Sequence, residues 1–316
     1  MPFHLSRSRL LLSAAAALAS TGRAARAQSL EPVRFTGVLT DDLTPVYWAF
    51  QHGMYRKAGI DLQIQGSNSG TAATAAVVSG SFDIGKGSVI ASLIAHLKGL
   101  PLVTVANGVV WDEKAPITLA VVAKDSTIKT GADLNNKIGS APALNDLGTL
   151  GINVWIDKNG GDSRTIKWIE VPNSAQAATI AAHRSAVCTL NEPAYTNAIE
   201  AGQVRLLAPC SSAIAQHYVI ATYFGNKDWV DKHVELARSF ARITYEAAEY
   251  TNAHHTETVD MMSAITKIPP EMMRKVFRAP GATSSDPGLL QPVIDVAAKY
   301  GSIPGRFEAK DAYITL

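Results

Sequence analysis

The chain has 316 residues, of which 47% are hydrophobic and 18% charged, and its formal net charge is +2. This length suits two domains of roughly 100–200 residues each. A charge so close to zero excludes the broad basic surface that nucleic-acid binding requires, and two cysteines are too few to hold a metal cluster.

The start of the chain has the pattern of a secretory signal. Arg7 and Arg9 precede an apolar run at residues 10–20, which is too short to span a bilayer. The small residues at 25–27 form a cleavage site before Gln28. We expect the mature chain to be periplasmic. The loss of four arginines and no acidic residue changes its formal charge from +2 to −2.

From Val33 onward, predicted strands alternate with predicted helices. Pro45 suits the first turn of a helix and Gly59 suits its end, so one helix is predicted over 45–59. Strands of this first unit are predicted at residues 33–39, 60–65, 82–87 and 102–107. The other helices are predicted at 71–79 and 88–98, the second of them capped by Ser88. This alternation is typical of a mostly parallel sheet with helices on both faces.

The alternation restarts after an apolar strand at 117–124. Strands of the second unit are predicted at residues 137–141, 165–171, 185–190 and 204–208. Its helices are predicted at 147–161, 174–184 and 193–202. A further strand at 217–224 is followed by sequence that looks helical from Asp228 onward. The pattern predicts an α/β fold of two lobes with a cleft between them, in which the strands at 117–124 and 217–224 form the crossovers.

Ligands of open α/β sheets bind beyond the carboxyl ends of the strands, so the loops that follow the strands are candidate sites. Two of these loops, SGT at 69–71 and LGT at 147–149, place glycine and threonine at a helix start. Free backbone N–H groups and the helix dipole favour an anion there, and Thr71 and Thr149 can add hydroxyl donors. Alternatively, these residues simply cap their helices. The presence of one such loop in each unit favours binding.

Charged side chains follow several of the other predicted strands. Lys86 can face an acidic ligand or be a solvated surface residue. Asp41 and Asp42 can accept hydrogen bonds from a ligand, although Asp42 is also placed to cap the following helix. Glu192 points toward a cleft or forms a hinge contact. Apolar walls of a site, or core packing, can come from Tyr47, Trp48 and Trp111.

Familiar catalytic and nucleotide-binding motifs are missing from the sequence. GSNSGT at 66–71 lacks the lysine of a P-loop and the spacing of a dinucleotide fingerprint. We find no nucleophile elbow, no H-E-x-x-H and no C-x-x-C. His254 and His255 are adjacent on a predicted helix, so their side chains diverge, and we expect surface rather than a metal site. Cys188 and Cys210 can pair in an oxidising compartment or be two buried thiols.

Five segments occur in an order and spacing that resemble one family. They are PVYWAFQHGMYRKAGIDLQI, AAVVSGSFDIGKGS, HLKGLPLVTVA, VVAKDSTIKTGADLNNKIG and TLNEPAYTNAIEAG. The chain resembles the nitrate, sulfonate, taurine and thiamine-precursor group of periplasmic solute-binding proteins, which serve ABC importers. The resemblance extends from about Val33 past Phe277. It implies a type II periplasmic binding fold with an interlobe ligand cleft.

The resemblance also implies a division of the chain and a set of site residues. After a signal peptide at 1–27, lobe 1 is expected at 28–120, lobe 2 at 121–221, and a return to lobe 1 with C-terminal helices at 222–316. The ligand loops of the family map onto the segments that the strand-end rule selects. With Trp48 as a wall, the expected ligand-binding residues are Thr40, Asp41, Asp42, Trp48, Ser67, Asn68, Ser69, Gly70, Thr71, Lys86, Gly87, Ser88, Asn107, Asn145, Gly148, Thr149 and Glu192.

The implied function is capture of a small molecule for an ABC permease in the inner membrane, by a monomer that has no cofactor and binds no nucleic acid. The two helix starts and Lys86 favour a small organic anion of the sulfonate or carboxylate type. Glu192, Tyr47 and Trp48 favour the alternative, a neutral or aromatic heterocycle such as a pyrimidine thiamine precursor. A ligand-sensing partner of a membrane receptor would share these features. A related pyrimidine synthase carries a cysteine-rich iron-binding stretch that this chain lacks, which argues against an enzyme.

Overall fold

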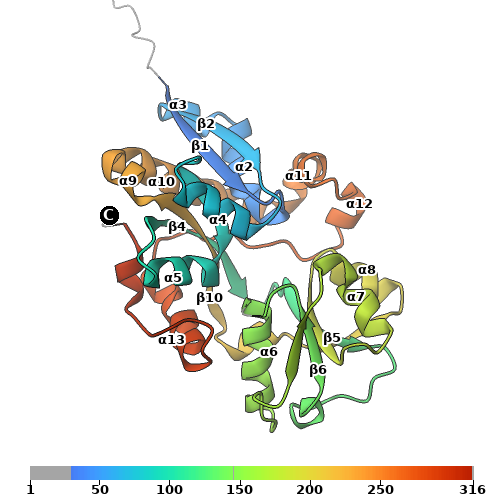
Figure 1. The fold of residues 1–316 in the computed structure, drawn as a ribbon. Helices are drawn as coiled ribbons and strands as arrows, with labels where there is room; N and C mark the ends of the chain where they lie inside the picture. The colour runs from blue at the N-terminus through green and yellow to red at the C-terminus, as the bar shows by residue number, and fades with distance from the viewer. Residues whose placement is uncertain (1–29, 145, 315–316) are drawn as a thin grey trace, which may run out of the picture.

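The computed structural model describes residues 30–144 and 146–314, so the expected signal peptide lies outside the described residues. The described chain forms two lobes (Figure 1), each built on one five-stranded sheet. The second lobe is drawn in green to yellow, whereas the first contains the blue and teal segments together with the orange and red C-terminal part. The predicted two-lobe α/β fold is confirmed.

The first sheet has the strand order β2-β1-β3-β10-β4. Its strands are β1 Glu31–Gly37, β2 Ile60–Gly66, β3 Ile84–Ser88, β4 Leu102–Asp112 and β10 His217–Asn226. β1 pairs in parallel with β2 and β3, whereas β10 runs antiparallel between β3 and β4. The carboxyl ends of β1, β2 and β3 therefore lie at one edge of the sheet.

The second sheet repeats this arrangement, in the order β7-β6-β8-β5-β9. Its strands are β5 Thr118–Ala123, β6 Ile138–Ala141, β7 Lys167–Glu170, β8 Val187–Asn191 and β9 Val204–Ala208. Here β6 pairs in parallel with β7 and β8, and β5 is the antiparallel strand in fourth place. The chain thus crosses between the sheets at 113–117 and again at 209–216. We propose these two crossovers as the lobe boundaries, a few residues before the expected ones.

Glycines determine where the first helices of lobe 1 begin and end. The helix predicted over 45–59 is in fact two helices, α2 Thr44–Gln51 and α3 Met54–Lys57, because Gly53 takes a left-handed conformation with φ of 64°. Gly59, with φ of 82°, ends this region as predicted. The next two helices are α4 Gly70–Val78 and α5 Val89–Leu97.

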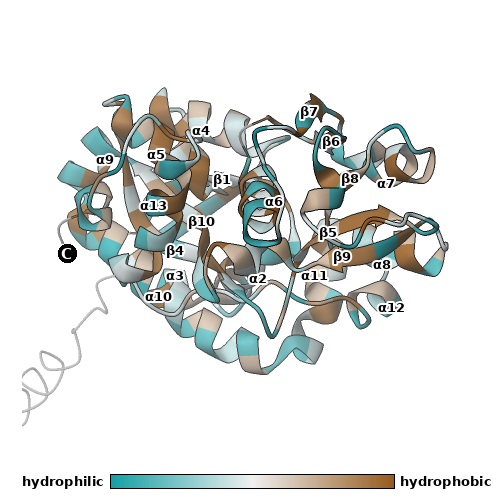
Figure 2. Cartoon of the chain, turned by 90° about the horizontal axis from the view of Figure 1, so that it is seen from below, coloured by the Kyte–Doolittle hydropathy of each residue, from teal (hydrophilic) through white to brown (hydrophobic). Residues whose placement is uncertain are grey.

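An aromatic cluster fills the core of lobe 1 on one face of the sheet. Phe240 stacks on Phe35 and on Tyr55, with ring centroids 5.9 and 5.6 Å apart, and meets Tyr223 edge-on at 5.6 Å. The buried Tyr55 hydroxyl forms a hydrogen bond of 2.8 Å with Thr244. Such ring pairs stabilise a core beyond the area they bury. Figure 2 shows the corresponding concentration of hydrophobic residues in the strands, with polar residues on outer helix faces.

The C-terminal part is less regular than predicted. Its helices are α9 Lys227–Lys232, α10 Val234–Ala253, α11 Val259–Thr266, α12 Pro270–Met273 and α13 Gln291–Lys299. The expectation of helix throughout is wrong for residues 277–286, which include only an isolated bridge between Gly281 and Val109, and for residues 300–308, which form turns, bends and irregular chain. Within the described chain, no helix is both long enough and apolar enough to cross a bilayer.

Lobe 2 carries the helices α6 Leu147–Lys158, α7 Asn173–Ala181 and α8 Ala194–Glu200. Leu150 and Val154 of α6 belong to a hydrophobic cluster that also contains Trp111 and Tyr218 of the first sheet. The two lobes therefore share one core beside the crossovers.

Both cysteines are free and buried in this structure. Burial raises the pKa of Cys210 to about 12, and the pKa of Cys188 is also raised by burial. The two cysteines are therefore buried thiols, which is one of the two alternatives that the sequence left open, and neither is a reactive thiolate.

Candidate functional site

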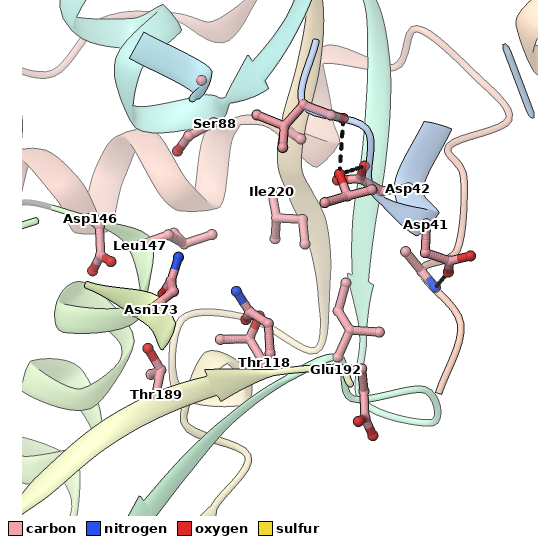
Figure 3. Close-up of a pocket in the computed structure, with 18 of the residues that line it drawn as sticks. Asp41, Asp42, Ser88, Thr118, Asp146, Leu147, Asn173, Thr189, Glu192 and Ile220 are labelled. Atoms are coloured by element: carbon pink, nitrogen blue, oxygen red, sulfur yellow. Dashed lines mark hydrogen bonds between the residues drawn. The ribbon is translucent and has the colours of Figure 1, made fainter. Parts of the chain in front are cut away.

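A cavity of about 410 Å³ lies between the lobes, at the carboxyl ends of the parallel strands. Figure 3 shows Asp41 and Asp42 on one side of it, and Asp146 and Asn173 on the opposite side. Three segments that were not expected also reach it, namely the amino end of β5, the first half of β10 and the segment after α12. The predicted residues that line the cavity are Thr40, Asp41, Asp42, Gly70, Lys86, Gly87, Ser88, Gly148 and Glu192.

The other predicted residues that the structure describes are not part of the cavity lining. Trp48 stacks on His52 and Tyr250, with centroids 3.9 and 4.9 Å apart. Asn145 lies outside the described residues. The remaining residues that do not line it are Ser67, Asn68, Ser69, Thr71, Asn107 and Thr149.

Asn107 anchors the C-terminal segment. It is fully buried within β4, which continues to Asp112, so it does not follow a strand end as expected. Its side-chain amide donates to the carbonyls of Ser284 and Asp286 at 2.9 and 3.2 Å, and its oxygen accepts from the Tyr313 hydroxyl. The side-chain hydrogen bonds of Asn107 thus join β4 to the C-terminal segment.

Lys86 and Asp42 form an ion pair at the lobe 1 side of the cavity. Lys86 is only 7% exposed, so it is not the solvated residue that was one of the two expectations. Its ammonium contacts a carboxylate oxygen of Asp42, whose other oxygen accepts from the Thr40 hydroxyl at 2.7 Å. Asp42 makes no capping bond to α2, which corrects the expected cap. The positive charge of Lys86 is therefore offset within the protein itself.

Asp41 is held by a buried arginine from the C-terminal part. The guanidinium of Arg278 donates to one carboxylate oxygen at 2.6 Å, and the backbone N–H of Ala279 donates to the other at 3.0 Å. Arg278 also bonds the hydroxyls of Thr44 and Thr258. A buried charge requires such partners. Sequence reasoning missed Arg278, because no local pattern links residues so distant along the chain.

The two helix starts that suggested an anion site are capped from within. The Ser69 hydroxyl accepts from the backbone N–H of Ala72 at 3.1 Å at the start of α4. The Asp146 carboxylate accepts from the backbone N–H of Thr149 at 2.7 Å at the start of α6. The Thr149 hydroxyl donates to the Asp146 carbonyl at 2.8 Å, and Thr71 is exposed outside the lining. The capping interpretation therefore fits both loops.

Glu192 lies at the lobe 2 edge of the cavity. Its carboxylate accepts from the backbone N–H and the hydroxyl of Thr196, at 3.2 and 3.0 Å, and from the backbone N–H of Phe277. Burial nevertheless raises the pKa of this carboxyl, and burial likewise raises the pKa of Asp146. Within the described chain, neither carboxylate forms an ion pair with a basic side chain.

Several lining residues were not among the predicted ones. Thr118 lines the cavity because β5 is antiparallel and brings its amino end there; its hydroxyl donates to the Asn191 amide oxygen at 2.7 Å. Asn173 begins α7 and Asn191 ends β8, and both belong to segments that the strand-end rule does select. No local sequence pattern indicated that Ile220 or Phe277 would line the cavity. Apolar lining comes from Val38, Ile117, Pro142, Leu147, Ile220, Ala221, Phe277 and Ala279.

The charged lining is predominantly acidic. Four carboxylates, from Asp41, Asp42, Asp146 and Glu192, line the cavity together with one ammonium group, that of Lys86. Within the described residues, no group of three or more His, Cys, Asp or Glu side chains is arranged to hold a metal ion. The site thus combines apolar walls with an excess of hydrogen-bond acceptors.

Solved structures of two sulfonate-binding proteins resemble the whole fold. The periplasmic aliphatic sulphonate binding protein SsuA from Escherichia coli has a TM-score of 0.73 at 17% identity, over 91% of this chain and 93% of that one. The alkanesulfonate-binding protein SsuA from Xanthomonas axonopodis pv. citri, bound to MOPS, has a TM-score of 0.71 at 17% identity, over 90% and 99%.

A nitrate-binding protein has the same fold, and a family model matches the sequence itself. The periplasmic NrtA from Synechocystis PCC 6803 has a TM-score of 0.68 at 15% identity, over 89% of this chain and 84% of that one. No curated protein sequence matches the chain significantly. Residues 40–258 match the family model described as NMT1/THI5 like. In agreement with the sequence resemblance, the chain belongs to the NMT1/THI5-like family and has the two-lobe, type II fold of periplasmic binding proteins.

Proposed function

We propose that this chain is the extracytoplasmic solute-binding component of an ABC importer. In this role it captures a hydrogen-bond-donating, uncharged or cationic small molecule, such as an amino-substituted ring, and it performs no catalysis. The observation that carries the ligand class is the pair of carboxylates, Asp146 and Glu192, that line the cavity without a basic partner among the described residues. Support for the role itself comes from the family and from the fold shared with sulfonate- and nitrate-binding proteins. The partners are an inner-membrane permease and the solute.

The charge balance disfavours the organic anion that the sequence suggested. An anion in the cavity would meet Asp146 and Glu192, which lack basic partners within the described chain, and Lys86 is already paired with Asp42. Like charges brought close together repel each other. Donor groups of a ligand would instead find carboxylate oxygens, with Asn173 and Thr189 beside them. A volume of about 410 Å³ is within the usual range for small-molecule sites.

The decisive experiment compares ligands that differ in charge but not in shape. We expect isothermal titration calorimetry of the purified protein to detect 4-aminopyrimidine and not pyrimidine-4-carboxylate, which replaces the donor with an anion on the same ring. Ethanesulfonate and nitrate test the competing anion assignment, which Lys86 and the named structural neighbours favour. Preferential binding of either anion would overturn the ligand class. A permease and an ATPase encoded beside this chain would support import over sensing.

A further inference from the structure

Residues 275–279, which we call the strap, run past the cavity after α12. Phe277 and Ala279 of the strap line the cavity, although this segment belongs to neither sheet. The strap has no regular secondary structure beyond a turn at its start, so tertiary bonds must hold its position. Those bonds go to both lobes.

One end of the strap is fixed to lobe 1. Arg278, only 6% exposed, donates to Asp41, and the backbone N–H of Ala279 donates to the same carboxylate. Because Asp41 directly follows the first strand and its loop, this end moves with lobe 1. The bonds are charge-assisted and shielded from water, which makes them strong.

The other part of the strap contacts lobe 2. The backbone N–H of Phe277 donates to the Glu192 carboxylate, which Thr196 at the start of α8 also holds. The Lys275 ammonium lies 3.1 Å from a carboxylate oxygen of Glu200, at the end of the same helix. Both partners of this second contact are about half exposed, so it contributes little by itself. The strap therefore contacts lobe 2 at two points, the Glu192 carboxylate and the Glu200 carboxylate.

The side chain of Phe277 faces open space. It is 46% exposed, and it lines both the main cavity and a smaller cavity of about 230 Å³ beside His255 and Arg274. A large aromatic side chain left this exposed is not needed for core packing. Covering its apolar surface with a ligand would contribute favourable free energy to binding. An aromatic face favours a flat ring over a small tetrahedral group.

We propose that the strap closes the cleft over the solute, with Glu192 tying it to lobe 2 and the Phe277 ring stacking on a planar ring of the ligand. This inference rests on the proposed function for its ligand class. The strap itself does not depend on it, because its bonds to both lobes exist without a ligand. Phe277 is thus a specificity-determining residue, and Glu192 positions the strap while it also lines the cavity.

The tie to lobe 2 can be tested without any ligand. Spin labels at A75C and A178C, on the exposed faces of α4 and α7, report the distance across the cleft. The native cysteines are buried, so the introduced ones react selectively. We expect E192A to lengthen this distance in pulsed electron spin resonance. The matched control E170A changes an exposed glutamate of lobe 2 and should leave the distance unchanged. Equal distances in E192A and E170A would show that Glu192 does not tie the strap to lobe 2.

The stacking role is tested with 4-aminopyrimidine as the probe. We expect F277A to weaken its binding by about tenfold or more, the scale of a lost aromatic contact plus its buried area, and F277W to restore it. The control F50A removes another exposed phenylalanine, 43% exposed on α2, that does not line the cavity. Equal affinities of F277A and F50A would refute stacking. If the wild-type protein does not bind 4-aminopyrimidine, both the proposed ring ligand and the stacking on Phe277 are wrong. The spin-label distances still test whether the strap holds the two lobes together.

Discussion

Asp146 has two roles that compete for one carboxylate. It caps α6 through the backbone N–H of Thr149, and it lines the ligand cavity. Burial raises its pKa, and the hydrogen bonds from Thr149 offset that effect only in part. The ionised side chain is therefore an acceptor that the protein keeps at some cost to its own stability.

We predict that the effect of D146N on the free energy of unfolding depends on pH. Because the folded-state pKa of Asp146 is raised, its stabilising contribution is complete below the unfolded-state pKa and is lost as pH rises through the folded-state value. Asparagine keeps the capping oxygen but does not titrate. The free energy of unfolding of D146N, from urea denaturation of the ligand-free protein, should therefore rise relative to wild type as pH increases from the unfolded-state pKa of Asp146 through its higher folded-state pKa.

Asp133 supplies the control with the opposite sign. Its pKa is lowered by hydrogen bonds from the backbone N–H groups of Lys129 and Thr130. Its contribution is thus present above the unfolded-state pKa and lost as pH falls. D133N should become relatively less stable than wild type as pH rises. The same pH trend in both variants would contradict the assigned environment of Asp146.

Individual residues also show what local sequence can predict. The strand-end rule correctly selected Asp42, Lys86 and Glu192 as cavity residues, because it depends only on where strands end. It failed for Asn107, because β4 continues to Asp112 instead of ending at residue 107 as predicted. In the structure, a Cβ at Gly108 would lie 3.0 Å from the carbonyl oxygen of Ala221, so glycine allows the close approach of β10 instead.

At the scale of elements, the start of α6 is packed closely on β8. A Cβ on Gly148 would lie 2.5 Å from the hydroxyl oxygen and 3.0 Å from the methyl carbon of Thr189. Thr189 is β-branched and cannot move aside freely. We predict that G148A lowers the free energy of unfolding by about 1–3 kcal/mol, as overpacking does, measured by urea denaturation.

G151A is the matched control in the same helix. A Cβ at Gly151 would meet the backbone of Cys210 at 3.4 Å, which is ordinary contact. Replacing a glycine inside a helix by alanine should then stabilise the protein by up to about 1 kcal/mol. If both variants changed stability in the same direction, Thr189 would not be the obstacle we infer.

The alternation of strands and helices was predictable because each follows from a simple period of apolar residues and from Gly and Pro at the ends. The break at Gly53 and the irregular stretch at 277–286 were not. The sequence pattern predicts one helix over 45–59, which runs through Gly53. The stretch at 277–286 is ordered by long-range bonds such as that between Arg278 and Asp41, and no local period records them.

For the whole molecule, the shared core should couple the lobes. Leu150 of lobe 2 is 1% exposed and lies in one cluster with Trp111 and Tyr218 of the first sheet. We therefore predict a single unfolding transition in calorimetry, with equal calorimetric and van't Hoff enthalpies. L150A should cost about 2–5 kcal/mol and separate the transition into two.

I180A provides the comparison for this prediction. Ile180 is equally buried, but its cluster contains residues of lobe 2 alone. Its loss should lower the melting temperature and leave one transition. Two transitions in the wild-type protein would mean that the shared cluster does not couple the lobes.

The position of β10 also sets an order of events during synthesis. The second sheet is complete once β9 ends at Ala208. At that point β4 still has no neighbour in its sheet, because β10 is its pairing strand among the described residues and begins only at His217. A nascent chain halted before residue 217 would carry a finished second sheet and an unfinished first one, although the first began to emerge earlier.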